Sequence, residues 1–259
     1  MRKLKKALKL LWDGRFRFGL FHGVAASIEH RPALEAYGFK TIIDVGANRG
    51  QFSLLMAGLS PDADIIAFEP LIAAYKKLFQ MTRGLPKVRA INSAIGEERA
   101  MMLMNVSKRA DSSSLLPIGA AQVRIFPGTG HDHQEDVQLA PLSDFIGPKE
   151  ISSPSLLKID VQGYEINVLR GAADHLQTID VVYIEASFIE LYDGQPLASD
   201  VIDELLAYRF RLAGVYNLSL DKNGKAVQAD FLFERRSKPE APAATASNLS
   251  TPSTSKAKD

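Results

Sequence analysis

Residues 41–50 read Thr-Ile-Ile-Asp-Val-Gly-Ala-Asn-Arg-Gly, a short apolar run that passes directly into a turn containing two glycines. The run Thr41–Val45 is nearly continuous in apolar side chains, which is typical of a strand buried on both faces of a parallel sheet. Gly46 and Gly50 allow the backbone to turn sharply and to approach a ligand, and the stretch Gln51–Leu59 has helical spacing. A strand, a glycine turn and a helix in this order indicate an α/β fold.

The same alternation continues along the chain. Four further apolar runs predict strands, at Ile65–Phe68, Val88–Ile91, Leu156–Val161 and Ile179–Ile184. Amphipathic stretches between and after them predict helices at Ile72–Thr82, at Tyr164–Leu169 with a further turn to Leu176, and at Ser199–Tyr208. Alternating strands and helices predict a doubly wound sheet with helices on both faces.

Two regions depart from this alternation. The runs Phe210–Leu218 and Val227–Phe233 are joined by Asp-Lys-Asn-Gly, residues 221–224, which predicts an antiparallel hairpin at the end of the sheet. The stretch Ser107–Asp136 has weak periodicity and several glycines. We expect it to be an irregular segment, either a functional lid or a mobile insertion.

Composition limits the classes of function. The 259 residues are 46% hydrophobic and 24% charged with a net charge of +1, as in a soluble globular protein. This balance argues against a general nucleic-acid binder, and the lack of cysteine excludes disulfides, thiolate metal sites and cysteine nucleophiles. No apolar run reaches the roughly 18 residues of a membrane-spanning helix. The composition is compatible with a reducing, cytoplasmic location.

The two ends of the chain differ from its middle. Residues 1–20 hold seven basic side chains and one acid, and Leu4, Leu8 and Leu11 share one side of a short helix. We therefore predict a basic, helical N-terminal extension over residues 1–36. Two roles stay open for it: packing against the domain, or docking on an anionic membrane surface or an acidic partner, which would give peripheral membrane association.

The C-terminal residues 237–259 consist almost entirely of Ser, Pro, Ala, Thr and Lys, and Leu249 is the one large apolar side chain among them. Such a segment buries too little surface to offset its ordering entropy. The composition predicts a disordered tail, which leaves residues 37–236 as one folded domain.

Acidic residues follow two successive predicted strands, at the edge where open α/β sheets bind ligands. A dinucleotide-binding fingerprint needs glycine where this chain has Asn48 and Gln51, so the loop is poorly suited to bind a diphosphate. Asp44 instead suits a cationic ligand, and Glu69 can accept hydrogen bonds from two ribose hydroxyls. A ligand with a ribose, a positive centre and no required phosphate is S-adenosyl-L-methionine.

Five motifs stand out along the chain: Ile-Asp-Val-Gly-Ala-Asn-Arg-Gly-Gln-Phe at 43–52, Ala-Phe-Glu-Pro at 67–70, Leu-Lys-Ile-Asp-Val-Gln-Gly-Tyr-Glu at 157–165, Ile-Glu-Ala-Ser at 184–187 and Tyr-Asp-Gly-Gln-Pro at 192–196. Together they resemble the FkbM family of S-adenosylmethionine-dependent methyltransferases. The resemblance extends from about residue 40 to about residue 234. It implies a class I methyltransferase (Rossmann-like) fold, whose seventh strand is inserted antiparallel. It also implies methyl transfer to a hydroxyl, often on a sugar, glycan or polyketide-type acceptor.

The resemblance assigns a set of cofactor-binding residues. It places the methionine part of S-adenosylmethionine among Asp44, Gly46, Ala47, Asn48 and Gly50. It places the ribose at Glu69, the adenine beside Ser93 and Ala94, and a closing loop at Asp111, and it brings Asp160 close to the methyl group.

Asp160 and Glu185 are the predicted catalytic residues, because each follows or ends a strand on the side where the methyl group is expected. Asp160 could remove the acceptor proton if burial or Glu185 raised its pKa. Alternatively, Asp160 forms a structural ion pair with Lys158, which shares its face of the strand, and Glu185 is an ordinary cap. These alternatives stay open at the level of sequence.

His131 and His133 flank Asp132 and could bind a divalent cation or supply a base, but a glycine-rich loop offers no rigid geometry, and we expect no metal site. Two other functions remain as alternatives: a nucleotide- or nicotinamide-binding oxidoreductase, and a non-catalytic cofactor-binding module. The expected partner is a small-molecule or glycan acceptor.

Overall fold

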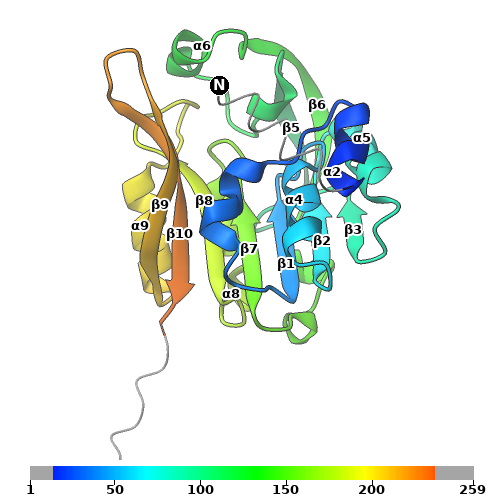
Figure 1. Cartoon of the computed structure of the whole chain (residues 1–259). Coiled ribbons are helices and arrows are strands. Elements are labelled where there is room, and N and C mark those ends of the chain that lie inside the picture. Colours follow the sequence, from blue (N-terminus) through cyan, green and yellow to red (C-terminus); the bar gives the residue numbers. More distant parts are fainter. Residues whose placement is uncertain (1–13, 237–259) are drawn as a thin grey trace, which may run out of the picture.

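The structure, a computed structural model, describes residues 14–236 and is built around one twisted sheet (Figure 1). The seven strands lie in the order β3-β2-β1-β7-β8-β10-β9. Their bounds are β1 (Thr41–Val45), β2 (Asp64–Phe68), β3 (Val88–Ile91), β7 (Ser155–Ile159), β8 (Val181–Ser187), β9 (Phe210–Leu220) and β10 (Ala226–Arg235). The first five in chain order are parallel, and β10 lies antiparallel between β8 and β9. This order confirms the predicted class I methyltransferase fold.

Helices cover both faces of the sheet, as the alternation of segments predicts. They are α4 (Gln51–Leu59), α5 (Ile72–Thr82), α7 (Glu165–Gly171), α8 (Ala173–Leu176) and α9 (Ala198–Ala207). Ile42 packs in one buried cluster with Leu54 of α4, whereas Ile43 packs in the other with Leu169 of α7 and Leu205 of α9. Successive side chains of β1 point to opposite faces, so a strand covered on both sides has to be apolar throughout.

The predicted hairpin is also confirmed. β9 and β10 pair antiparallel, and the turn between them closes with a backbone hydrogen bond from Asp221 to Lys225 of 2.8 Å. The Asp221 carboxylate accepts the N–H groups of Asn223 and Lys225, and Gly224 has a φ of +79°. The turn therefore uses Gly224 for its left-handed backbone conformation.

A second, three-stranded sheet corrects the expectation for Ser107–Asp136. It contains β4 (Ala94–Ile95), β5 (Ala100–Ser107) and β6 (His131–Ala140), with β6 in the middle. Between β5 and β6 lie η2 (Ala110–Ser112) and α6 (Ala120–Ile125), so the segment is ordered by short elements. Most of the first half of β6 is exposed and polar, which is why no apolar pattern revealed it. The short turns η3 (Leu142–Asp144) and η4 (Pro148–Glu150) lead from β6 to β7.

The described part of the predicted N-terminal extension contains α2 (Gly14–Phe21), η1 (Ile28–His30) and α3 (Arg31–Leu34). Val24 and Leu34 are buried in the same cluster as α4, so packing joins this part of the extension to the domain. The basic residues before position 14 and the tail from residue 237 lie outside the described residues, and the predictions for them stay predictions. Among residues 14–236, no helix has the length and apolar character needed to cross a membrane.

Candidate active site

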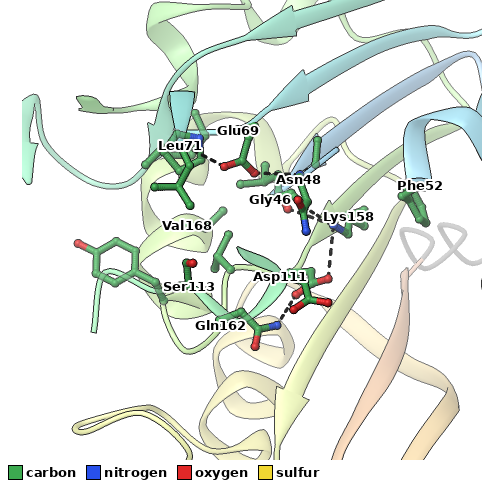
Figure 2. A pocket seen from close by; sticks show the side chains of 18 of the residues that line it. Gly46, Asn48, Phe52, Glu69, Leu71, Asp111, Ser113, Lys158, Gln162 and Val168 are labelled. Carbon is green, nitrogen blue, oxygen red and sulfur yellow. Dashed lines mark hydrogen bonds and ion pairs between the residues drawn. The ribbon is translucent and has the colours of Figure 1, made fainter. Parts of the chain in front are cut away.

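A cavity opens at the carboxyl ends of β1, β2 and β7, where open α/β sheets bind ligands (Figure 2). Its wall also includes residues from η2 and from the segment that precedes α3. Eight of the ten predicted cofactor-binding residues line it: Gly46, Ala47, Asn48, Glu69, Ser93, Ala94, Asp111 and Asp160. The tertiary structure therefore brings together most of the residues that the sequence singles out. Asp44, Gly50 and the predicted catalytic Glu185 are not part of the wall.

The two glycines of the β1–α4 loop are required for packing within the protein, and Gly46 also lines the cavity. Gly46 has a φ of +77°, and a Cβ added there would lie 1.8 Å from the carbonyl oxygen of Asp160. Gly50 has a φ of +92°, and a Cβ added there would lie 3.1 Å from Leu78 of α5. Both glycines allow the left-handed backbone, and Gly46 also allows the loops after β1 and β7 to touch.

Asp44 lies beneath this loop, fully buried, and does not reach the cavity. Its Oδ2 accepts a hydrogen bond from Ser53 Oγ at 2.7 Å, and its Oδ1 lies 3.2 Å from Lys158 Nζ. Lys158 Nζ also donates to the carbonyl oxygen of Gly46 at 2.9 Å. Asp44 thus positions the loop through Lys158, a role different from the direct cofactor contact that the sequence predicts.

The Lys158–Asp160 pair considered from sequence exists, with 3.8 Å between Nζ and Oδ2, but it is longer than the pair with Asp44. Burial opposes the charge on Lys158, but the carboxylates of Asp44 and Asp160 outweigh it and raise the pKa of the ammonium. Lys158 is therefore protonated, and its ammonium is held by Asp44 and the carbonyl of Gly46.

Glu69 is almost completely buried and faces the cavity with a carboxylate held by the backbone. Its Oε2 accepts the N–H of Asn48 and its Oε1 accepts the N–H of Leu71, both at 2.9 Å. Burial raises the pKa of Glu69 to about 7, although these two hydrogen bonds favour the ionised form. Each oxygen can still accept a further hydrogen bond, so the group can bind a pair of hydroxyls.

Asn48 adds an unsatisfied acceptor to the same wall. Its backbone is left-handed, with a φ of +48°, and its buried Oδ1 has no hydrogen-bond partner within the described chain. Buried polar atoms are nearly always satisfied, so an orphaned acceptor on a cavity wall suits the donor of a ligand.

Gln162 joins the two predicted catalytic acids. Its Nε2 donates to Asp160 Oδ1 at 2.7 Å and to Glu185 Oε2 at 2.8 Å, and its Oε1 accepts from the Tyr192 hydroxyl at 2.9 Å. The other oxygen of Glu185 accepts from Gln228 at 2.7 Å. Burial, and then the charge of Asp160, raise the pKa of Glu185 well above its usual range. Glu185, predicted from the sequence as a catalytic residue, is therefore linked to Asp160 through Gln162 and does not itself line the cavity.

The η2 segment closes one side of the cavity. Asp111 lines the cavity and pairs with Arg109 at 3.0 Å, and Ser113 Oγ accepts the N–H of Ser107 at 3.0 Å. Ser114 Oγ donates to the backbone carbonyl of Gln162 at 2.6 Å. These contacts tie the segment after β5 to the loop that carries Asp160, as expected for a cover over the site.

His131 and His133 lie on exposed β6 and take no part in the wall of the cavity. His133 Nδ1 is 2.9 Å from Asp132, an exposed pair. The described residues contain no group of three or more His, Asp or Glu side chains arranged to hold a metal ion.

The cavity residues without a role assigned from the sequence include His30, Phe52 and Gln162. Gln162 lies within the 157–165 motif, and its side-chain amide, a hydrogen-bond donor close to Asp160 in the sequence, could have indicated a role in the site. His30 precedes the motif region and is held by residues near the C-terminus, so no local pattern could have identified it.

The donors and acceptors of this wall fit S-adenosylmethionine better than a diphosphate. Glu69 and Asn48 offer acceptors to hydroxyl or ammonium donors, and Asp160 adds a negative charge. Lys158 is the one Lys or Arg among the described lining residues, and it is already held by Asp44. The wall therefore lacks a free cation for phosphate oxygens.

Comparison with known proteins agrees with this geometry. The model of the "Methyltransferase FkbM domain" matches residues 44–212. "Methyltransferase 1" of Beauveria bassiana is 32% identical over 158 residues, a match that covers 56% of this chain and 63% of that protein. "2-O-methyltransferase NoeI" of Sinorhizobium fredii is 25% identical over 173 residues, which cover 64% of this chain and 71% of that protein.

Among solved structures, the precorrin-6y C5,15-methyltransferase of Geobacter metallireducens is 10% identical, with a TM-score of 0.46 over 83% of this chain and 93% of the other. The strand order, not this likeness, carries the fold assignment. The family model covers more than half of the chain, including the β1–α4 loop, Glu69 and Asp160. This protein belongs to the FkbM methyltransferase family.

Proposed function

We propose that this protein is an S-adenosylmethionine-dependent methyltransferase that methylates a hydroxyl group of a sugar, glycan or related small-molecule acceptor. The observation that carries the proposal is the pairing, in one cavity, of a backbone-held carboxylate at Glu69 with a second carboxylate at Asp160. Family membership supports the methyl-transfer part.

In this proposal, different residues of the cavity bind different parts of the cofactor. Glu69 accepts the ribose hydroxyls, Asn48 Oδ1 accepts a donor of the methionine part, and Ser93 and Ala94 flank the adenine. Asp160 supplies negative charge near the positive centre. When bound, the cofactor supplies a methyl group activated by a positively charged sulfur.

The protein has to align the acceptor hydroxyl, exclude water and accept a proton, because methyl transfer is an in-line displacement. Phe52, Leu71 and Leu115 give the cavity apolar walls, and the tie between Ser114 and Gln162 keeps the η2 cover closed. Gln162 holds Asp160 at a fixed place in the wall. These contacts preorganise the site around a small acceptor.

The relative named as a 2-O-methyltransferase supports a hydroxyl acceptor. An oxidoreductase is less well supported, because Asn48 and Gln51 occupy the positions where a dinucleotide loop needs glycine. A non-catalytic binding module would share the cofactor site and lack turnover.

Two measurements test the proposal. Calorimetry should show binding of S-adenosylhomocysteine and none of NAD, and the reverse result would overturn the cofactor assignment. Incubation with methyl-labelled S-adenosylmethionine and a small-molecule and glycan extract of the cells that carry the protein should place label in a methyl ether. Label in an amine would overturn the hydroxyl assignment, and S-adenosylhomocysteine binding without any transfer would favour the binding module.

A further inference from the structure

A histidine on the wall of the cavity is held by a buried carboxylate. His30, at the end of η1, lines the cavity, and its Nδ1 lies 3.2 Å from Asp230 Oδ2 and 3.0 Å from the Tyr183 hydroxyl. Asn217 Nδ2 lies 3.1 Å from the same nitrogen and donates to Asp230 Oδ2 at 2.7 Å. Four elements, η1, β8, β9 and β10, thus meet around one imidazole ring.

The environment of Asp230 determines which nitrogen of His30 carries the proton. Burial opposes ionisation of Asp230, but hydrogen bonds from His30, Asn217 and Tyr183 outweigh it and lower the pKa of the carboxyl group. The Tyr183 hydroxyl donates to Asp230 Oδ2 at 3.0 Å, and burial, followed by the charge of Asp230, raises the pKa of this tyrosine. An ionised Asp230 accepts a hydrogen bond from the Nδ1–H of His30, and in this tautomer the lone pair of the ring lies on Nε2.

The ring is also fixed sterically. Its centroid is 5.6 Å from that of Phe52 and 5.5 Å from that of Tyr183, both in edge-to-face geometry. Phe52 separates it from Lys158, whose Nζ lies 5.5 Å from the Phe52 ring centroid. A base held by packing and by a carboxylate has a defined orientation in advance of substrate binding.

His30 lies on the opposite side of the cavity from the proposed adenosine contacts. Glu69 and Ser93 follow β2 and β3, at one end of the sheet, and Asp160 follows the central β7. His30 packs over β8, β9 and β10, at the other end. An acceptor that approaches from this side would have His30 in the wall of the cavity that Asp160 also lines.

The acidic and basic side chains of the wall other than His30 are less suited to take a proton. Lys158 is protonated, and Glu69 is engaged by two backbone N–H groups. Asp160 accepts from Gln162 and lies 3.8 Å from the Lys158 ammonium. Asp111 is half-exposed and paired with Arg109.

We propose that His30 is the general base of the methyl transfer and that Asp230 is its positioning residue, an inference that rests on the proposed function. The acceptor oxygen forms a bond to the methyl carbon as the carbon–sulfur bond breaks and its electron pair stays on sulfur. The hydroxyl proton passes to Nε2 of His30, and the resulting imidazolium releases it to water. The family model, which matches residues 44–212, includes neither His30 nor Asp230.

Nuclear magnetic resonance of the histidine side chains tests the arrangement without an acceptor. The full-length wild-type protein should show His30 as the Nδ1–H tautomer, and Asp230→Asn should convert it to a mixture. An Nε2–H tautomer in the wild-type protein would overturn the proposal.

The position of His30 is tested with two cofactor analogues. Sinefungin carries an amine-bearing carbon in place of the methyl-bearing sulfur, whereas S-adenosylhomocysteine is uncharged there. The midpoint of the His30 titration should lie about one pH unit lower with sinefungin, because a cation near the ring disfavours imidazolium. The other ionisable groups around the ring are Asp230, Tyr183 and, beyond Phe52, Lys158. Equal midpoints would place His30 away from the methyl group and sink the proposal.

Turnover of labelled S-adenosylmethionine with the extract fraction methylated by the wild-type protein tests the chemistry. His30→Gln should lose about 10²–10⁴-fold in turnover with little change in S-adenosylhomocysteine affinity. His30→Ala should regain activity with added imidazole, and Asp230→Asn should show a smaller loss. The matched control is His133→Gln, which breaks an exposed histidine–carboxylate pair outside the cavity. Near-normal turnover of His30→Gln would overturn the proposal.

These experiments distinguish failure of the proposed function from failure of the role assigned to His30. If the wild-type protein binds no S-adenosylhomocysteine, the proposed function fails. If it binds this ligand and transfers label while His30→Gln does the same, only the assignment of His30 fails. If His30→Gln does not fold, the tautomer and the two titration midpoints of the wild-type protein still decide.

Discussion

Glu69 shows how one residue can carry both recognition and pH dependence. Its carboxylate is buried and held by two backbone N–H groups, and its pKa is about 7 because burial outweighs those hydrogen bonds. The neighbouring charges are Lys158, which lowers the pKa, and Asp44, which raises it. Hydroxyl donors bind the ionised form, so ligand binding below neutral pH has to release a proton.

The affinity for S-adenosylhomocysteine should therefore fall by up to about tenfold per pH unit below pH 7 and level off above it. Calorimetry between pH 6 and about 8.5 measures this slope and the proton release directly. Glu69→Gln should weaken binding at the alkaline end by about 1.5–3 kcal/mol and remove the slope. Equal affinity across the range in the wild-type protein would contradict the ribose assignment.

The same raised pKa affects the stability of the unliganded protein. The pKa of Glu69 in the folded protein lies above its ordinary value of 4.5, so the protonated side chain adds to the free energy of unfolding. This contribution is fully present below pH 4.5 and is lost as the pH rises through about 7. Urea unfolding at pH 5 and at pH 8 should show a smaller decrease for Glu69→Gln than for the wild-type protein.

Asp160 is the second residue whose charge can be tested. Its carboxylate is partly exposed to the cavity, with Gln162 and Lys158 on its protein side. Asp160→Asn should weaken binding of the cationic sinefungin about tenfold more than binding of S-adenosylhomocysteine, because only the former has a charge at the reacting centre. Equal losses for the two ligands would indicate that Asp160 only shapes the loop, and a large drop in melting temperature would indicate a structural pair with Lys158.

At the scale of elements, the site depends on the contact between the loops that follow β1 and β7. The Asp160 N–H donates to the carbonyl of Val45 at 3.1 Å, and Lys158 donates to the carbonyl of Gly46. The parallel pairing of β1 with β7 sets the register of these loops. Glycine at position 46 is what allows them to approach.

A comparison of Gly46→Ala with Gly194→Ala distinguishes the cost of disrupting this loop contact from the cost of backbone strain alone. Both glycines have nearly the same positive φ, +77° and +78°, but only at Gly46 does an added Cβ meet a backbone carbonyl, whereas Gly194 has open space around it. Gly194→Ala should cost about 1–2 kcal/mol of unfolding free energy. Gly46→Ala should cost at least about 3 kcal/mol and reduce S-adenosylhomocysteine affinity. Similar losses in urea unfolding would show that the loop yields easily.

At the scale of the whole molecule, the two ends of the chain should contribute differently to stability. Val24, Ala26, Ala33 and Leu34 are buried in the cluster that packs α4 on the sheet. The composition of residues 237–259 predicts no comparable packing.

Removal of residues 237–259 should therefore leave the melting temperature and the S-adenosylhomocysteine affinity unchanged. Removal of residues 1–36 should lower the unfolding free energy by at least about 4 kcal/mol, because it exposes the buried cluster beneath α4. Calorimetric scans of both truncated proteins beside the full chain make the comparison. A drop of several degrees after loss of the tail would show that it packs on the domain.

Local signals predicted most of the main sheet. Thr41–Val45 matches β1, because a strand buried on both faces is a continuous apolar run. Gln51–Leu59 and Ile72–Thr82 match α4 and α5, because helices that pack on a sheet carry apolar side chains at helical spacing. β7 and β8 were recognised with shifted ends, since loop residues such as Val161 are also apolar. The first half of β6 is exposed and polar and shows no such pattern. Its pairing with β5 and β4 depends on the tertiary structure.

For this protein, the sequence by itself determined the α/β fold, the antiparallel closure of the sheet and the sites of Asn48, Glu69 and Asp160. These follow from short-range patterns of burial and from the rule that strand ends share one edge of a sheet. Only the tertiary structure decided that Asp44 pairs with Lys158, that Gln162 links Glu185 to Asp160, and that His30 pairs with Asp230. Those pairings join segments far apart in the chain, and their contact depends on strand order and packing, which no local pattern encodes.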